Sequence, residues 1–248
     1  MKIKSLLAFI CLALALSVHA SADPLDDANR AFAEGHYHES TLGYQSVLTQ
    51  NGYSSPVLFN LGNSYYREGD FANAILAYQR AQWLSPGNPD IAANLSVARK
   101  QAGLPVVEPN WSDRLTGIMN ANAWAWLGSG ALTLLCLGLL ARAFRPERRT
   151  LSTALSTACA LVLLASTVAM VLSADKLNQA VVLDKKATAL ISPFPAAQTA
   201  FTPAPGEIVT TQKTYHDFIL VKDSTGRTGW ISQSQIAPIV PFTKPQPL

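Results

Sequence analysis

The histidines and cysteines are the residues best suited to bind a metal or act as nucleophiles, and their spacing supports neither chemistry. His36 and His38 flank Tyr37, but no further histidine or cysteine lies near them in the sequence. The cysteines are too far apart for a metal-ligand cluster or a disulfide framework: Cys11, Cys136 and Cys159. No Ser/His/Asp set or nucleotide-binding loop is evident. We therefore expect no catalytic, cofactor-binding or metal-binding residues, and a protein that is not an enzyme.

Four arginines form the most basic stretch of the chain: Arg142, Arg145, Arg148 and Arg149. The stretch joins two runs, 115–141 and 150–174, that contain no Asp, Glu, Lys or Arg. Each run supplies the roughly 20 apolar residues that a helix needs to cross a bilayer. We predict transmembrane helices at 123–142 and 151–173 with a short loop at 143–150. That loop is too short for a nucleic-acid module, and the net charge of +3 does not by itself imply such a partner.

The start of the chain predicts the side of the membrane on which the other segments lie. Residues 1–22 combine two lysines, an apolar run and small residues, as a secretory signal peptide does; an uncleaved anchor is the alternative. Both readings export the segment that follows. Short loops rich in Lys and Arg stay in the cytoplasm, so the loop 143–150 should be cytoplasmic. Lys176, Lys185 and Lys186 follow the second span, and we expect the last two to belong to a folded domain.

A period of 34 residues repeats before the membrane segment. Gly35 recurs as Gly69, Tyr44 recurs as Tyr78, and Asn60-Leu61 recurs as Asn94-Leu95. The second copy, 55–88, matches the pattern more clearly than the degenerate copy at 21–54. Residues 89–103 supply one more helix. This spacing resembles the tetratricopeptide repeat, a pair of antiparallel helices of this length. We place the repeat domain at 23–104, followed by an interfacial linker at 105–122 with a short helix near Trp111.

Repeats of this kind present a concave face that binds peptides or protein termini. The spacing assigns eight residues to that face: Leu25, Asn29, Phe32, Phe59, Asn60, Asn63, Tyr66 and Arg67. Asn29 and Asn60 resemble the asparagine pair of carboxylate-clamp tetratricopeptide domains, but Leu25, Asp90 and Asn94 replace the basic members. This predicts hydrogen bonding to an extended backbone rather than capture of an acidic C-terminus. Alternatively, the asparagines only support the repeat.

Short apolar runs separated by turns follow the second span and predict strands. They cover 181–183, 188–191, 207–210, 218–221 and 228–231, with a Pro-rich loop between Ser192 and Gly206. The stretch Gly226-Arg-Thr-Gly-Trp-Ile231 resembles the signature of bacterial SH3-like barrels. We assign this domain to 178–240 and expect Trp230 to pack in its core or to line a groove. Residues 241–248 read as a flexible tail.

The order of the segments resembles the BatE-type proteins of the bacterial Bat (aerotolerance) group. The stretches that carry the resemblance are FNLGNSYYREGDFANAILAYQRA and GRTGWI. The resemblance implies von Willebrand A-domain membrane proteins and a MoxR-type ATPase system as partners.

The fold class we predict is multidomain: tetratricopeptide helical hairpins, two transmembrane helices and a small SH3-like β-barrel. Both folded domains should lie on the outer, periplasmic side of the bacterial inner membrane. The function we expect is that of a non-enzymatic, membrane-anchored scaffold that binds envelope proteins. The alternative is a protein that binds cell-wall peptidoglycan or senses envelope stress.

Overall fold

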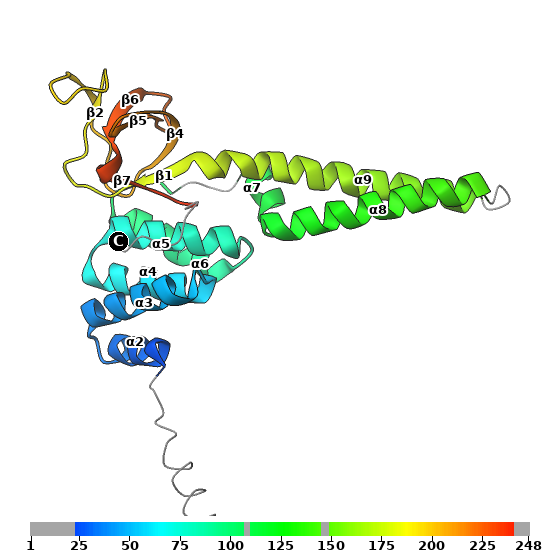
Figure 1. Cartoon of the computed structure of the whole chain (residues 1–248). Coiled ribbons are helices and arrows are strands. Elements are labelled where there is room, and N and C mark those ends of the chain that lie inside the picture. Colours follow the sequence, from blue (N-terminus) through cyan, green and yellow to red (C-terminus); the bar gives the residue numbers. More distant parts are fainter. Residues whose placement is uncertain (1–22, 107–109, 145–148, 241–248) are drawn as a thin grey trace, which may run out of the picture.

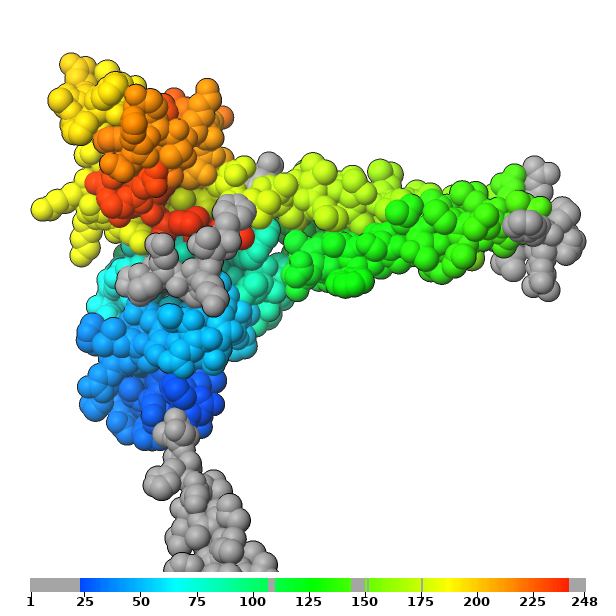
Figure 2. All heavy atoms as spheres, in the orientation of Figure 1, coloured from blue at the N-terminus to red at the C-terminus, as the bar shows by residue number. Residues whose placement is uncertain are grey.

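The computed structural model describes residues 23–106, 110–144 and 149–240 (Figure 1). The predicted signal peptide at 1–22, most of the Arg-rich loop (145–148) and the tail at 241–248 lie outside the described residues. The chain builds a stack of short helices, a long hairpin of two helices, and a small β-sheet. The hairpin projects from the place where the stack and the sheet meet (Figures 1 and 2).

The stack consists of two helical hairpins and one further helix, as the 34-residue period predicts. Their bounds are α2 Pro24–Ala33, α3 Tyr37–Asn51, α4 Ser55–Glu68, α5 Phe71–Leu84 and α6 Pro89–Gln101. Three first turns are capped by a side chain that accepts from backbone N–H groups: Asp23, Asp70 and Asn88. Gly69 ends α4 at φ +80°, a left-handed conformation that glycine adopts without steric cost. Local sequence thus fixes where these helices begin and end.

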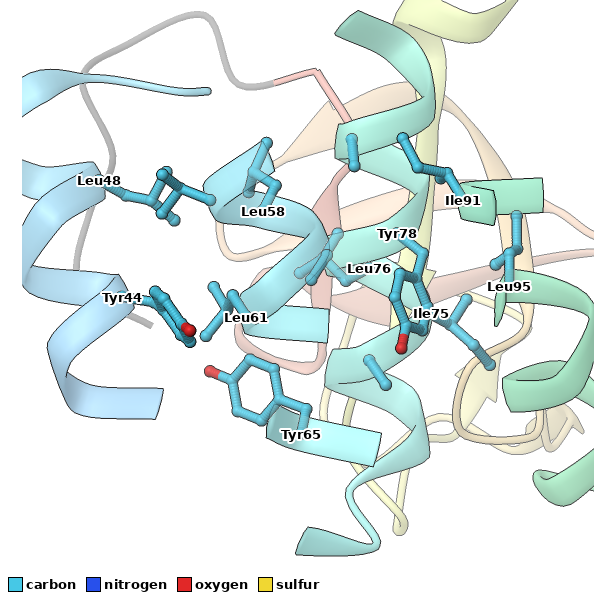
Figure 3. Packing of buried hydrophobic residues seen from close by; sticks show 14 of the residues in the cluster. Tyr44, Leu48, Leu58, Leu61, Tyr65, Ile75, Leu76, Tyr78, Ile91 and Leu95 are labelled. Atoms are coloured by element: carbon cyan, nitrogen blue, oxygen red, sulfur yellow. The ribbon is translucent and has the colours of Figure 1, made fainter. Parts of the chain in front are cut away.

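The core of the stack is filled by large side chains from successive helices (Figure 3). Tyr44, Leu58, Ile75 and Tyr78 are almost completely buried. A Cβ atom added at Gly62 would lie 2.6 Å from Cε1 of Tyr78. Only a glycine at this position lets the Tyr78 ring approach α4 so closely.

The two apolar runs form α8 Ala121–Phe144 and α9 Arg149–Ala174, which pack against each other along their length. Both helices are long and apolar enough to cross a membrane by length and composition. At 1.5 Å per residue, the 24 residues of α8 extend about 36 Å, compared with about 30 Å for a bilayer core. Gly128 and Gly138 face Ser166 and Ser156, so the helix axes lie close together. Large apolar side chains such as Leu161 (62 % exposed) point away from the pair.

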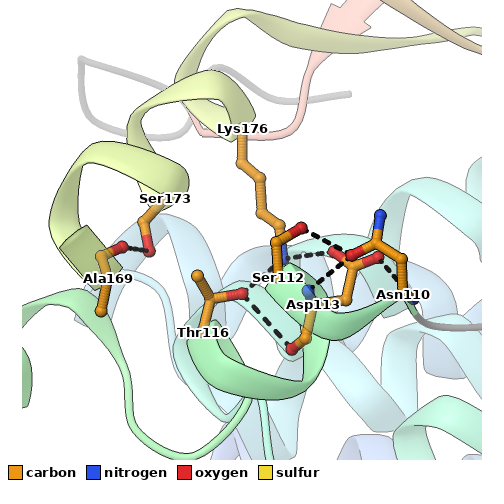
Figure 4. Close-up of polar contacts among 7 residues, drawn as sticks. All are labelled: Asn110, Ser112, Asp113, Thr116, Ala169, Ser173 and Lys176. Carbon is orange, nitrogen blue, oxygen red and sulfur yellow. Dashed lines mark hydrogen bonds and ion pairs between the residues drawn. The ribbon is translucent and has the colours of Figure 1, made fainter. Parts of the chain in front are cut away.

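The base of the hairpin is held by the short helix α7, Trp111–Thr116, which the sequence predicts near Trp111. Asn110 and Asp113 form a reciprocal capping box at its start. Lys176, just beyond α9, lies 3.4 Å from Oδ1 of Asp113 and 3.3 Å from Oγ1 of Thr116 (Figure 4). The partly exposed ion pair contributes little stability by itself, but it ties the end of α9 to α7.

The C-terminal segment is a seven-stranded antiparallel sheet in the order β3-β2-β6-β5-β4-β1-β7. The strand bounds are β1 Gln179–Val182, β2 Ala189–Leu190, β3 Thr199–Phe201, β4 Ile208–Tyr215, β5 Phe218–Lys222, β6 Thr228–Ser232 and β7 Ile236–Pro238. Two 3-10 turns flank it, η2 Asp175–Asn178 and η3 Gln233–Gln235. Among the described strands β3 and β7 are the two ends, so this is an open sheet and not a closed barrel.

Five of these strands correspond to the predicted apolar runs, whereas β3 and β7 were not expected. β3 lies inside the Pro-rich segment that reads as one long loop, and β7 precedes the predicted tail. Each has three residues, too few to show an alternating pattern, and each is defined by its pairing with β2 or β1. Lys185 and Lys186 were expected in a folded domain after the second span. Both lie in the turn between β1 and β2, within the sheet segment.

The stack and the sheet share one hydrophobic core. Val181, Ala237 and Ile239 of the sheet segment belong to the same buried cluster as the core residues of the stack. Arg80, which is 7 % exposed, donates from Nη2 to the carbonyl oxygen of Pro238 at 2.9 Å. Its guanidinium lies 5.5 Å from the centre of the Tyr53 ring. The stack and the sheet therefore form one packed body, from which α8 and α9 project (Figure 2).

Candidate functional site

Two hydrogen-bonded triads, one repeat apart, connect the helices of the stack. In the first, Oδ1 of Asn29 accepts from the Tyr44 hydroxyl at 2.7 Å and from Nδ2 of Asn60 at 3.4 Å. In the second, Oδ1 of Asn63 accepts from the Tyr78 hydroxyl at 2.7 Å and from Nδ2 of Asn94 at 2.9 Å. All three members recur at 34 residues. These asparagines therefore do support the repeat, as one of the two interpretations of the sequence held.

Burial raises the pKa of three tyrosines of the stack. Loss of solvent raises the pKa of Tyr44 and Tyr78 above the ordinary value, although each phenol also takes part in a side-chain hydrogen bond that lowers it. Burial also raises the pKa of Tyr65, to about 12, against the smaller effect of its hydrogen bond with Gln45. The three phenols are neutral at physiological pH and serve as hydrogen-bond donors or acceptors.

A pocket of about 210 Å³ is lined by residues of α2, α4, α5 and α6. Its lining residues are Phe32, Asn63, Tyr66, Arg67, Tyr78, Asn94 and Val97. Four of the eight residues that the spacing assigns to the concave face are among them, namely Phe32, Asn63, Tyr66 and Arg67. The structure thus brings together side chains as far apart in the sequence as Phe32 and Val97, as a binding surface requires.

The other four predicted residues do not line this pocket. Leu25 and Phe59 pack against the core of the stack, and the Phe59 ring centre lies 6.0 Å from that of Tyr78. Asn29 and Asn60 belong to the first triad, next along the stack. Asn29 remains exposed and Asn60 is half-buried.

Three lining residues were missed at the sequence level: Tyr78, Asn94 and Val97. The repeat period contains the signal for two of them. Val97 lies 34 positions after Asn63, and Asn94 lies 34 positions after Asn60. Because 89–103 supplies one helix and not a complete repeat, the spacing assigns none of its residues to the concave face. In the structure, α6 forms one wall of the pocket.

Arg67 is held at the edge of the pocket by an aromatic residue. Its guanidinium lies over the Tyr37 ring, 4.7 Å from the ring centre, and donates to the Tyr37 hydroxyl. Phe32 contacts the same ring edge-on, with centres 5.5 Å apart. The pair Tyr66 and Phe71 repeats the pair Phe32 and Tyr37 one period later, at 5.6 Å. Tyr37 is thus explained by packing and by its contact with Arg67.

Trp230, the residue predicted for the second site, lies on β6 opposite Leu220 and Leu190. It is half-buried and belongs to a surface cluster, not to the core of the sheet. Its ring centre is 6.4 Å from that of Tyr215, which in turn is 6.2 Å from that of Phe194. Phe194 and Tyr215 are 56 % and 45 % exposed. We call Phe194, Tyr215 and Trp230 the aromatic cluster.

The turn that leads to Trp230 is fixed by a buried carboxylate. Oδ1 of Asp223 accepts from the backbone N–H groups of Thr225 and Arg227, and Oδ2 accepts from Nε of Arg227 at 2.6 Å. Burial by itself would raise the pKa of Asp223, but the hydrogen bonds from Arg227 and Thr225 outweigh it and leave the pKa below its usual value. The hairpin of β5 and β6 therefore holds the Gly-x-x-Gly-Trp stretch in place.

Comparison with known proteins supports the helical stack directly. Residues 55–88 match the tetratricopeptide repeat family. The match covers α4 and α5 with the turns that flank them, which are the elements that contribute Asn63, Tyr66, Arg67 and Tyr78 to the pocket. Tetratricopeptide repeats typically bind proteins. No curated protein matches the chain significantly.

Proposed function

We propose that this chain is a non-enzymatic scaffold, anchored in the bacterial inner membrane, that binds envelope proteins through its tetratricopeptide stack. The observation that carries the proposal is the pocket lined by α2, α4, α5 and α6 within a stack that contains a tetratricopeptide repeat. It combines apolar walls with amide groups, as a surface for a peptide does. An SH3-like assignment of the sheet, resting on the GRTGWI stretch, belongs to the same proposal.

Membrane anchoring is supported by α8 and α9. Their outer surfaces are apolar over most of their length, and a soluble core helix would bury such side chains. The chain enters α8 and leaves α9 at the same end of the hairpin, beside the stack and the sheet (Figure 1). With a signal peptide at 1–22 and a cytoplasmic loop at 143–150, both domains would lie on the periplasmic side. The Bat-type resemblance suggests von Willebrand A-domain membrane proteins and a MoxR-type ATPase system as partners.

A thiol-directed photo-crosslinker that cannot cross membranes tests location and partner binding together. The reagent is attached in spheroplasts to Val97→Cys, in a chain whose three native cysteines are replaced by serine. Val97 lines the pocket and is 47 % exposed, so we expect discrete cross-linked envelope proteins. The control Gln50→Cys lies exposed on α3 outside the pocket and should be labelled without giving these products. Glu147→Cys, in the predicted cytoplasmic loop, should stay unlabelled.

Two outcomes would contradict the proposal separately. Labelling of Glu147→Cys in intact spheroplasts would place the loop on the wrong side of the membrane. Cross-linked products that are the same for Val97→Cys and Gln50→Cys, or absent from both, would argue against a partner in the pocket.

A second candidate function is binding of cell-wall glycan, and the aromatic cluster favours it. Exposed rings such as Phe194 and Tyr215 offer flat apolar surfaces with a polar group nearby. We expect the full chain in nanodiscs to sediment with purified sacculi, and Phe194→Ala to weaken sedimentation several-fold. Trp111→Ala removes an even more exposed ring on α7, outside the cluster, and should have no effect. If the unmodified chain stays in the supernatant, this function is rejected.

A further inference from the structure

The positive charge of Arg67 is not neutralised by any carboxylate in the described part of the chain. Among these residues its contacts are the ring and the hydroxyl of Tyr37, both neutral. The adjacent Glu68 accepts a hydrogen bond from Thr41 and lies 3.8 Å from Nδ1 of His38. Arg30, in contrast, forms an ion pair with Asp27 at 3.3 Å. Arg67 thus presents a fixed cation at the edge of an apolar pocket.

The second triad orients the polar groups of the pocket. Because Oδ1 of Asn63 accepts from both Tyr78 and Asn94, its Nδ2 remains able to donate. Asn94 donates from Nδ2 in this bond, so its Oδ1 remains able to accept. Among the described residues, none bonds to Nδ2 of Asn63 or to Oδ1 of Asn94. A donor and an acceptor side by side match the carbonyl and the N–H of a peptide backbone, which must be satisfied when a chain becomes buried.

The remaining walls are apolar. Phe32 and Tyr66 are half-buried, and Val97 contributes an exposed aliphatic surface. A side chain without charge can enter between these three residues, while a charged one would lose its hydration there. The pocket therefore offers three separate features: an amide pair for the backbone, an apolar wall for one side chain, and a cation for an acid.

We infer that the pocket recognises an extended segment inside a partner protein, with an apolar side chain against Phe32, Tyr66 and Val97 and an Asp or Glu side chain on Arg67. This inference rests on the proposed scaffold function and specifies its partner. An internal acid fits better than a C-terminal carboxylate. Arg67 is the one cation among the residues that line the pocket, and it lies at the pocket edge, so the pocket provides one charge for a side-chain carboxylate and no second cation for a chain end.

Selection from random peptides displayed inside a coat protein, which have no free C-terminus, tests this directly. The target is the full chain in nanodiscs. We expect selected sequences to share an Asp or Glu near an apolar residue. With Arg67→Gln, Kd for a selected peptide should rise about tenfold, because a charge-assisted hydrogen bond is lost. Arg67→Lys should retain part of the affinity, and Arg67→Glu should shift the selection toward Lys and Arg.

The control is Arg30→Gln, which removes the same charge from α2 outside the pocket and should leave Kd unchanged. Helical ellipticity and the unfolding midpoint of every variant establish that the stack is folded. The inference is wrong if Arg67→Gln binds as tightly as the unmodified chain, or if Arg67→Glu still selects acidic peptides. Enrichment confined to a library with free C-termini would also overturn it. The cross-links from Val97→Cys do not depend on an acid, so the scaffold proposal is tested separately.

Discussion

Replacement of Gly206 by alanine is expected to lower the free energy of unfolding by about 2–5 kcal/mol. Gly206 has φ +84°, and a left-handed conformation costs an L residue about 1–2 kcal/mol. A Cβ atom there would also lie 2.6 Å from Cδ1 of Ile75 and 3.1 Å from Cδ1 of Leu104. Both atoms are terminal methyl groups of side chains in the shared core, and Ile75 is completely buried, so these side chains must shift to admit the new methyl group, at about 1–3 kcal/mol.

The matched control is Gly226→Ala, in the turn between β5 and β6. Gly226 has a similar φ of +91°, but the nearest atom to an added Cβ is Cε of Lys222 at 3.9 Å. This variant carries the conformational cost alone, about 1–2 kcal/mol. The excess loss in Gly206→Ala therefore measures the contact between stack and sheet.

Urea unfolding of the full chain in detergent micelles provides the measurement. Far-UV ellipticity follows the helices, and fluorescence follows the sheet in a background that keeps Trp230 and replaces the other four tryptophans by phenylalanine. The unmodified chain should lose stack and sheet in one transition, whereas Gly206→Ala should separate the two signals. Equal midpoints for the two glycine variants would mean that the shared core contributes nothing to stability.

The repeat and the apolar helices could be predicted because their signals are local and periodic. Gly35 recurs as Gly69 and Tyr44 recurs as Tyr78, a spacing typical of paired helices. The two runs without charged residues likewise predict the long helices α8 and α9. The site was partly predictable for the same reason: the spacing that placed Asn63 and Tyr66 on one face also contains Val97, one period further on.

The remainder depends on contacts that no local pattern encodes. Val181 and Ile239 are apolar residues of the kind that fill the core of a sheet. Nothing in the sequence indicates that they pack against the stack. Arg80 would be expected at the surface, where most arginines lie, yet its backbone acceptor at Pro238 is 158 residues away. Tyr37 shows the same limit, because its contact with Arg67 spans 30 residues and joins two helices.

Replacement of Gly62 by valine should affect both stability and binding. The Cβ position at Gly62 is 2.6 Å from Cε1 and 2.7 Å from Cδ1 of Tyr78, in the middle of a rigid ring. The ring is held by the bond from its hydroxyl to Asn63 and by Phe59, so it cannot move away freely. We expect a loss of about 2–3 kcal/mol in the free energy of unfolding, typical of overpacking in a tight core.

Displacement of the ring should also disturb the pocket, since Tyr78 and Asn63 both line it. The comparison variant is Tyr78→Phe, which removes the hydroxyl and keeps the ring in place. It should cost about 1 kcal/mol, the net contribution of one hydrogen bond, and it frees Oδ1 of Asn63 to accept from another donor. Both free energies come from urea unfolding, and peptide affinity comes from titration of an acidic peptide selected on the unmodified chain.

The two variants separate the roles of ring and hydroxyl. If the ring positions the floor of the pocket, Gly62→Val weakens peptide binding more than Tyr78→Phe, even at temperatures where both stacks are folded. If Gly62→Val keeps full affinity while losing stability, the pocket does not depend on how closely α5 approaches α4. In that case Asn63 and Asn94 would be positioned by their mutual hydrogen bond alone, and Asn94→Ala should abolish the affinity that Gly62→Val retains.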